Sequence, residues 1–235
     1  MIILPYRQSE KSELRKETRK KHILRTAADA FSSKGYHQTS VKDIADASGI
    51  SVGTFYLYFK NKEEIFEKLY DEMWAYILSL IAYAEKDISY SPSQVLARTI
   101  TANLWGYKRF NKLSKIMLIE AIGINPRFQA KYTELMLESV SRMKSGFSQL
   151  MHSGSIQIAD LDVAATAYIG AVNNVITCLL LSEKEYNLNS CAYSLIIFLM
   201  QALNMSFDRT NIKHMIDDMI NELESNHFKS PTQLF

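Results

Sequence analysis

Apolar side chains recur three or four residues apart along almost the whole chain, from about Glu17 to Glu224, with short breaks between the segments. This period is typical of α-helices, and only 8 glycines and 4 prolines among 235 residues interrupt it. The alternation that predicts strands is almost absent. The sequence therefore predicts an all-α fold of nine or ten helices: three short helices first, then the longer helices of a bundle.

The three short helices have well-marked ends. The first is expected from about Thr18 to Lys34, and Gly35 follows where a left-handed C-cap is favoured. Ser40 is the expected N-cap of the second helix, and Ser51 that of the third, Val52–Phe59. Two short helices joined by a glycine turn indicate a helix-turn-helix motif, whose second helix lies in the major groove of DNA.

The third short helix has an unusual distribution of aromatic residues. Phe55 and Phe59 are four apart and are expected to face the first two helices. Tyr56, Leu57 and Tyr58 then point largely away from this small core, and large exposed side chains of this kind indicate a binding partner. The alternative is that the tyrosines pack against a neighbouring helix.

Small residues at the start of this helix leave backbone N–H groups able to bind phosphate, and their neighbours are placed to meet base edges. Lysines add positive charge at its far end. The candidates are Ser51 and Gly53 for phosphate, Val52 and Thr54 for bases, and Lys60 and Lys62 for the DNA backbone.

Charge is unevenly spread along the chain. Residues 1–70 carry 13 Lys and Arg against 9 Asp and Glu, whereas residues 71–235 carry 14 against 16. A basic N-terminal part indicates a polyanionic partner, although a solvated charged helix has a similar composition. The basic N-terminal arm, Arg15 to Arg25, is expected to reach DNA as well, with Lys20 and Lys21 near phosphates; the alternative is a solvated helix start.

Five runs carry a resemblance to a known family: Ala27–Phe31, Lys34–Tyr36, Thr39–Ala45, Gly49–Phe59 and Asn61–Glu64. On these runs, about 50 residues resemble the DNA-binding domain of TetR-family transcriptional regulators. The resemblance implies phosphate contacts for Thr39, Ser40, Lys42 and Lys62, major-groove contacts for Ser51, Val52, Gly53 and Thr54, and backbone contacts for Tyr56 and Tyr58.

Two positions depart from the family's commoner pattern. Val52 stands where Lys or Arg is frequent, and Leu57 where a polar or aromatic residue is frequent. Because valine can contact a thymine methyl group but not a guanine edge, we expect A·T-rich half-sites.

The rest of the chain is expected to hold a second domain. The predicted division is residues 1–62 for the arm and helix-turn-helix, 63–226 for ligand binding and dimerisation, and 227–235 for a frayed tail. The resemblance implies a homodimer, formed through helices at about 161–181 and 191–205, on a pseudo-palindromic double-stranded operator. The alternative for these apolar helices is an internal core.

The resemblance also implies a cavity for a small effector of unknown identity, in a body that the helix from Lys62 to Asp87 links to the DNA-binding domain. Polar or aromatic side chains on apolar faces are its candidate lining: Trp105, Tyr107, Met117, Glu120, Tyr168, Asn173 and Asn174. For Asn173 and Asn174, a hydrogen bond across the dimer interface is expected in preference to contact with the ligand. This inventory suits a mostly apolar ligand that releases the repressor from DNA.

Other classes of protein are less well supported. We expect a cytoplasmic protein, because no apolar run approaches the roughly 18 residues of a membrane span and no signal peptide begins the chain. No catalytic motif or metal-ligand spacing is found, so we expect no enzyme, no cofactor and no metal site. A purely structural helical scaffold is the second alternative to a DNA-binding protein, after an enzyme. An apolar stripe over residues 208–224 predicts one further helix of unassigned role.

Overall fold

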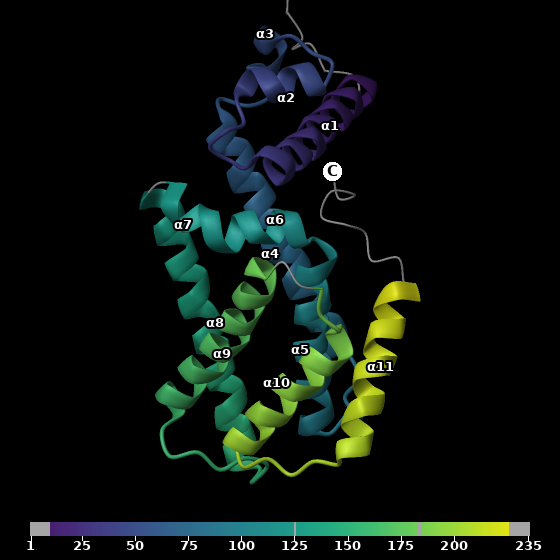
Figure 1. The fold of residues 1–235 in the computed structure, drawn as a ribbon, viewed down its shortest axis with the longest axis vertical. Coiled ribbons are helices and arrows are strands. Elements are labelled where there is room, and N and C mark those ends of the chain that lie inside the picture. Colours follow the sequence, from purple (N-terminus) through teal and green to yellow (C-terminus); the bar gives the residue numbers. More distant parts are fainter. Residues whose placement is uncertain (1–9, 125, 183–184, 226–235) are drawn as a thin grey trace, which may run out of the picture. The chain divides into compact units, whose positions relative to one another are not determined.

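The structure is a computed structural model that describes residues 10–124, 126–182 and 185–225. These residues form helices and turns without a strand, as expected (Figure 1). They make two compact units, one ending at Met73 and the other beginning at Trp74. The expected tail, residues 227–235, lies outside the described part.

The first unit contains α1 (Glu10–Lys34), α2 (Val41–Ala47), α3 (Val52–Phe55) and the start of α4 (Lys62–Ala84). The rings of Phe31, Tyr36 and Phe66 pack together, with centroids 5.0–6.0 Å apart. Ile65, Phe66, Leu69 and Met73 of α4 are buried. The first unit therefore extends beyond the expected boundary at residue 62, because the first turns of α4 complete its core.

Two helix ends differ from expectation. α1 begins at Glu10 rather than about Thr18, because strong helix formers extend the helix beyond its buried stripe. The α-helical part of α3 ends at Phe55 rather than Phe59. The N–H groups of Leu57 and Tyr58 bond to carbonyls three residues back, so the chain continues as tight turns that still bring Phe59 into the core.

The second unit continues from α4 into α5 (Pro92–Arg109) and a run of short helices. These are α6 (Asn111–Lys115), the π-helix η1 (Ile116–Glu120) and α7 (Ala121–Ile124). Four long helices follow: α8 (Pro126–His152), α9 (Leu161–Leu181), α10 (Leu188–Ala202) and α11 (Arg209–Ser225). Ser91 is the N-cap of α5 and Asp160 that of α9, and α8 begins at Pro126.

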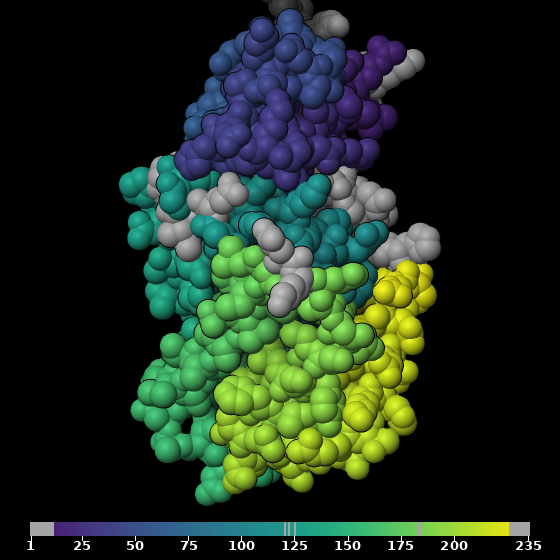
Figure 2. Space-filling model, in the orientation of Figure 1, coloured from purple at the N-terminus to yellow at the C-terminus, as the bar shows by residue number. Residues whose placement is uncertain are grey.

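The centre of the second unit is α5, which packs against α9, α10 and α11. Gly106 of α5 allows a close approach of α4: a Cβ atom there would lie 2.7 Å from Leu80 Cδ1 and 2.8 Å from Ile77 Cδ1. The stripe expected over residues 208–224 forms α11, which lies against α5 and beside α10 (Figures 1 and 2).

Candidate nucleic-acid interface

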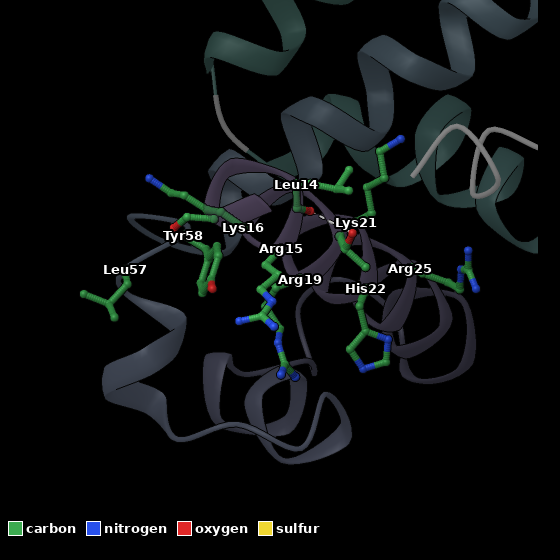
Figure 3. Close-up of a pocket in the computed structure, with 11 residues that line it drawn as sticks. Leu14, Arg15, Lys16, Arg19, Lys21, His22, Arg25, Leu57 and Tyr58 are labelled. Carbon is green, nitrogen blue, oxygen red and sulfur yellow. Dashed lines mark hydrogen bonds between the residues drawn. The ribbon is translucent and has the colours of Figure 1, made fainter. Parts of the chain in front are cut away.

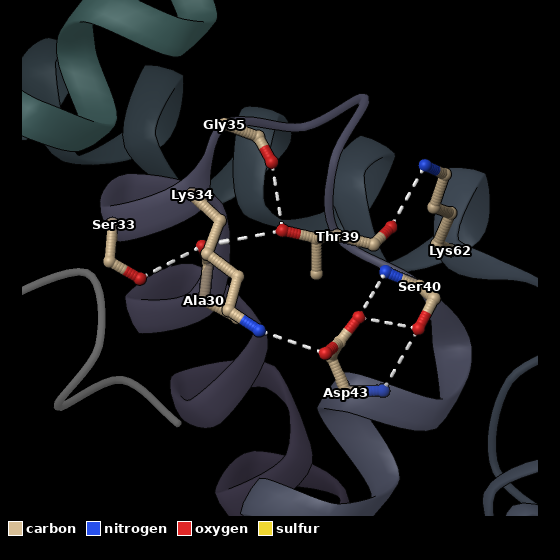
Figure 4. Close-up of polar contacts among 8 residues, drawn as sticks. All are labelled: Ala30, Ser33, Lys34, Gly35, Thr39, Ser40, Asp43 and Lys62. Carbon is tan, nitrogen blue, oxygen red and sulfur yellow. Dashed lines mark hydrogen bonds and ion pairs between the residues drawn. The ribbon is translucent and has the colours of Figure 1, made fainter.

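The start of α2 is fixed by a network of polar contacts (Figure 4). The Ser40 hydroxyl accepts from the Asp43 N–H at 3.1 Å, and the Asp43 carboxylate accepts from the Ser40 N–H at 2.9 Å. Lys34 at the end of α1 donates to the same carboxylate at 2.8 Å. The Lys34 and Ser40 hydrogen bonds hold the pKa of Asp43 well below its usual range. The capping box fixes the start of α2, the Lys34–Asp43 ion pair joins α2 to α1, and the Ser40 and Lys42 side chains are exposed.

Two of the residues expected at phosphates point inward in the free protein. Thr39 is buried, and its hydroxyl donates to the carbonyls of Gly35 at 2.8 Å and Ala30 at 3.3 Å. The Lys62 ammonium donates at 2.9 Å to the carbonyls of both Tyr36 and Thr39, and lies 4.4 Å from the centre of the Tyr36 ring. These bonds give both side chains a role in holding the loop between α1 and α2 against α4.

The start of α3 is capped as the sequence predicts. The Ser51 hydroxyl accepts from the Thr54 N–H at 3.0 Å and lies 2.9 Å from the Thr54 hydroxyl. Ser51, Val52 and Gly53 are exposed, and Thr54 is half-buried. These residues form one continuous surface at the beginning of the helix.

The aromatic residues of α3 divide between core and solvent. Phe55 and Phe59 are fully buried, whereas Tyr56 is 55% exposed and Leu57 is 75% exposed. Tyr58 is half-buried, and Lys60 is exposed. The two phenylalanines therefore anchor the segment while Tyr56 and Leu57 are presented outward. That is the arrangement a DNA-contacting helix requires.

Residues 23–69 match the family model described as "Bacterial regulatory proteins, tetR family". Residues 23–69 therefore form a DNA-binding domain of the TetR-family kind. The chain is accordingly a DNA-binding transcriptional regulator. A curated relative, the fatty acid metabolism regulator protein of Bacillus subtilis (strain 168), is 25% identical over 185 residues, which are 77% of this chain and 94% of that protein.

Solved structures extend the likeness beyond the first unit. FadR from Bacillus subtilis in complex with stearoyl-CoA aligns with a TM-score of 0.66 and 23% identity, covering 77% of this chain and 97% of that one. AibR in complex with isovaleryl coenzyme A and operator DNA aligns with a TM-score of 0.62 and 22% identity, covering 80% of this chain and 100% of that one. At these identities the likeness shows the fold of this chain.

The ligand-lining candidates predicted from the sequence are unevenly buried. Trp105, Tyr107, Met117 and Tyr168 are buried in the second unit. Asn173 is half-buried and donates to the Met136 sulfur of α8 at 3.5 Å, and Asn174 is exposed. The side chain of Glu120 lies outside the described residues.

The sequence analysis missed two buried polar groups in this unit. The Tyr76 hydroxyl on α4 and the Asn103 Oδ1 atom on α5 have no hydrogen-bond partner among the described residues. Burial raises the pKa of Tyr76 to about 12 and that of Tyr168 further above its usual value. Unpaired buried polar atoms are costly unless water or a ligand satisfies them, so these two are further candidates for ligand contact.

One helix of the second unit is more apolar than expected. By length and composition α9 could cross a membrane, with a mean hydropathy of 1.6, yet only 28% of that window is buried. The expectation of no apolar run near that length is therefore wrong for α9. Val163 and Leu181 of α9 and Phe198 of α10 are each more than half exposed. This surface needs a partner to cover it.

Proposed function

We propose that this protein is a cytoplasmic, homodimeric repressor that binds a pseudo-palindromic operator and leaves it on binding a mostly apolar acyl thioester. The observation that carries the proposal is the exposure of Tyr56 and Leu57 on a segment that Phe55 and Phe59 anchor in the core. Exposed Ser51, Val52 and Gly53 begin the same segment. Further phosphate contacts are proposed for exposed Ser40, Lys42 and Lys60. Tyr58 extends the DNA-contacting surface towards α1.

The dimer is proposed to form through α9 and α10. Small residues along α9 allow close helix approach, and exposed Val163, Leu181 and Phe198 supply apolar area. One helix-turn-helix contacts only a few base pairs, so two copies about 34–36 Å apart are needed for tight and specific binding. A second copy of the chain covers this surface better than lipid, because Asn173 and Asn174 lie mid-way along α9.

The ligand is proposed to be a fatty acyl-CoA. Structures similar to this chain hold stearoyl-CoA and isovaleryl coenzyme A. Buried aromatic side chains of α5 and α9 suit an acyl chain, and the unpaired polar atoms of Tyr76 and Asn103 suit a thioester carbonyl or amide.

Release from DNA is proposed to follow from population shift. Residues 62–73 of α4 belong to the first unit and residues 74–84 to the second. A ligand that binds better to a state with a different separation of the two DNA-binding units lowers DNA affinity by that difference in affinity and no more. The loss of DNA affinity therefore measures how far the ligand discriminates between the two states.

The DNA proposal is tested by selecting bound duplexes from a random library and measuring affinity by fluorescence anisotropy. Tyr56→Phe should lower affinity about 5- to 150-fold per dimer, because each of the two subunits loses one hydrogen bond worth about 0.5–1.5 kcal/mol. Tyr132→Phe on α8 is the matched control and should bind like the unaltered protein. If the unaltered protein selects no sequence, or its affinity does not depend on salt, the proposal fails.

The ligand proposal is tested with the selected operator and three probes: stearoyl-CoA, free coenzyme A and stearate. Stearoyl-CoA should release the protein from DNA and raise its thermal midpoint, because a ligand stabilises the state that it binds. Free coenzyme A should do neither. Release by an unrelated apolar compound but not by any acyl-CoA would refute the proposed ligand class while leaving DNA binding intact.

A further inference from the structure

A groove of about 1180 Å³ lies between the N-terminal half of α1 and the segment after α3, entirely within the first unit (Figure 3). Its lining is strongly basic and contains no acidic residue. The lining residues are Ser12, Leu14, Arg15, Lys16, Thr18, Arg19, Lys21, His22, Arg25, Leu57 and Tyr58.

The basic side chains form a row along one face of α1. Arg15, Arg19 and His22 are spaced by four and three residues, so they share a helix face. Arg15 and Arg19 extend side by side in the same direction (Figure 3). No described carboxylate forms an ion pair with Arg15 or Arg19, and both are exposed. Such a row of unneutralised guanidinium groups suits a polyanion.

The groove continues the DNA-contacting surface of α3. Tyr58 and Leu57 form its far side, directly after Tyr56 in the chain. Leu57 is 75% exposed, which places an apolar side chain beside the row of cations. Sugar and base edges offer apolar contacts between charged phosphates, so this combination fits nucleic acid better than an acidic peptide.

We propose that the α1 groove, defined by Arg15, Arg19, His22, Leu57 and Tyr58, grips the phosphate backbone of DNA that flanks each half-site. The proposal rests on the proposed function and extends it beyond the helix-turn-helix. Residues 12–22 rise about 15 Å, which corresponds to about four nucleotides of one strand at 3.4 Å each. The groove thereby lengthens the stretch of DNA that each subunit contacts, without adding base-specific contacts.

The sequence-based expectation covered the arm from Arg15 to Arg25 and placed Lys20 and Lys21 near phosphates, whereas the groove singles out other residues of that arm. The Lys20 ammonium lies 5.8 Å from the centre of the buried Phe59 ring, and Lys20 does not line the groove. Lys21 lines it but points away from Arg15 and Arg19 (Figure 3). The arginine pair is therefore the part of the arm that the geometry aims into the groove.

The test compares two duplexes with the same selected half-sites: one trimmed to the half-sites and one with about five added base pairs of arbitrary sequence at each end. The unaltered protein should bind the longer duplex at least about tenfold more tightly at about 50 mM salt. The double variant Arg15→Ala/Arg19→Ala should lose this advantage and bind the trimmed duplex as before. The salt slope on the longer duplex should fall by about 3 to 4, since four phosphate contacts per dimer are removed.

Two control variants separate charge from folding. Arg15→Lys/Arg19→Lys keeps the charge and should keep most of the advantage of the longer duplex. Lys112→Ala/Lys115→Ala removes two exposed charges from α6 in the second unit and should change neither affinity. All three variants should melt at the temperature of the unaltered protein, because the altered side chains are exposed.

The inference is overturned if Arg15→Ala/Arg19→Ala loses the same affinity for both duplexes, or loses affinity for neither. It is also overturned if the unaltered protein binds poly-glutamate more tightly than the longer duplex. An unaltered protein that binds the trimmed duplex but gains nothing from flanking DNA would overturn it too, while leaving the proposed function standing. An unaltered protein that binds neither duplex would refute the proposed function itself.

Discussion

Removing the Glu222 carboxylate should loosen α11 from the second unit. Arg98 of α5 is buried, with 1% of its side chain exposed, and donates two hydrogen bonds to Glu222 at 2.9 and 2.8 Å. It also donates to the Ala84 carbonyl at 3.3 Å, and its guanidinium lies 4.8 Å from the centre of the Tyr90 ring. Of these four contacts, Glu222→Ala would remove the two hydrogen bonds to Glu222 and leave the Ala84 carbonyl and the Tyr90 ring.

The expected cost follows from this geometry. Breaking a fully buried ion pair costs about 3–5 kcal/mol, because the remaining charge is uncompensated. Glu222 is 31% exposed, so water would partly solvate the site, and we expect about 2–3 kcal/mol for Glu222→Ala. That corresponds to a fall of about 4–12 °C in the melting temperature of a chain of this size. The double variant Arg98→Met/Glu222→Leu should recover most of this loss, since it leaves no buried charge.

Thermal unfolding followed by circular dichroism tests this, with Arg98→Met and Glu222→Leu as the single variants that complete a double-mutant cycle. The Arg98 hydrogen bonds lower the pKa of Glu222, so the stabilisation by this pair is complete above the ordinary pKa of about 4.5 and is lost as pH falls through the lower folded pKa. Glu222→Gln should therefore weaken the loss of stability in acid. A double variant less stable than Glu222→Ala, or single variants that melt with the unaltered protein, would refute the argument.

Three further predictions concern other parts of the molecule. Phe198→Glu places a charge on the exposed face of α10 and should make the protein monomeric in sedimentation at micromolar concentration; an intact dimer would exclude this face. Burial raises the pKa of Glu72 to about 7, so stability should fall as pH rises from about 4.5 to 7, and Glu72→Gln should abolish that decline in chemical denaturation. Tyr76→Phe removes an unpaired buried hydroxyl and should stabilise the free protein by up to about 1 kcal/mol while reducing the thermal shift caused by stearoyl-CoA; a larger shift would exclude ligand contact.

Local features of the DNA-binding unit were predictable because they depend on near neighbours in sequence. The caps at Ser40 and Ser51, the buried pair Phe55 and Phe59, and the exposure of Tyr56 follow from helix periodicity and capping chemistry. These features carry the family resemblance as well. Helix ends were less predictable where no apolar stripe marks them, as at the start of α1.

Contacts between distant segments could not be predicted in the same way. The sequence alone determined an all-α fold, a helix-turn-helix and its outward-facing residues, because periodicity and caps act within one or two helical turns. Only the tertiary structure decided that Lys62 turns inward to Tyr36, that Arg98 meets Glu222 124 positions away, and that Arg15 and Arg19 share a groove with Tyr58. Such pairings depend on how helices pack, and each of these side chains would be an ordinary exposed charge on an isolated helix.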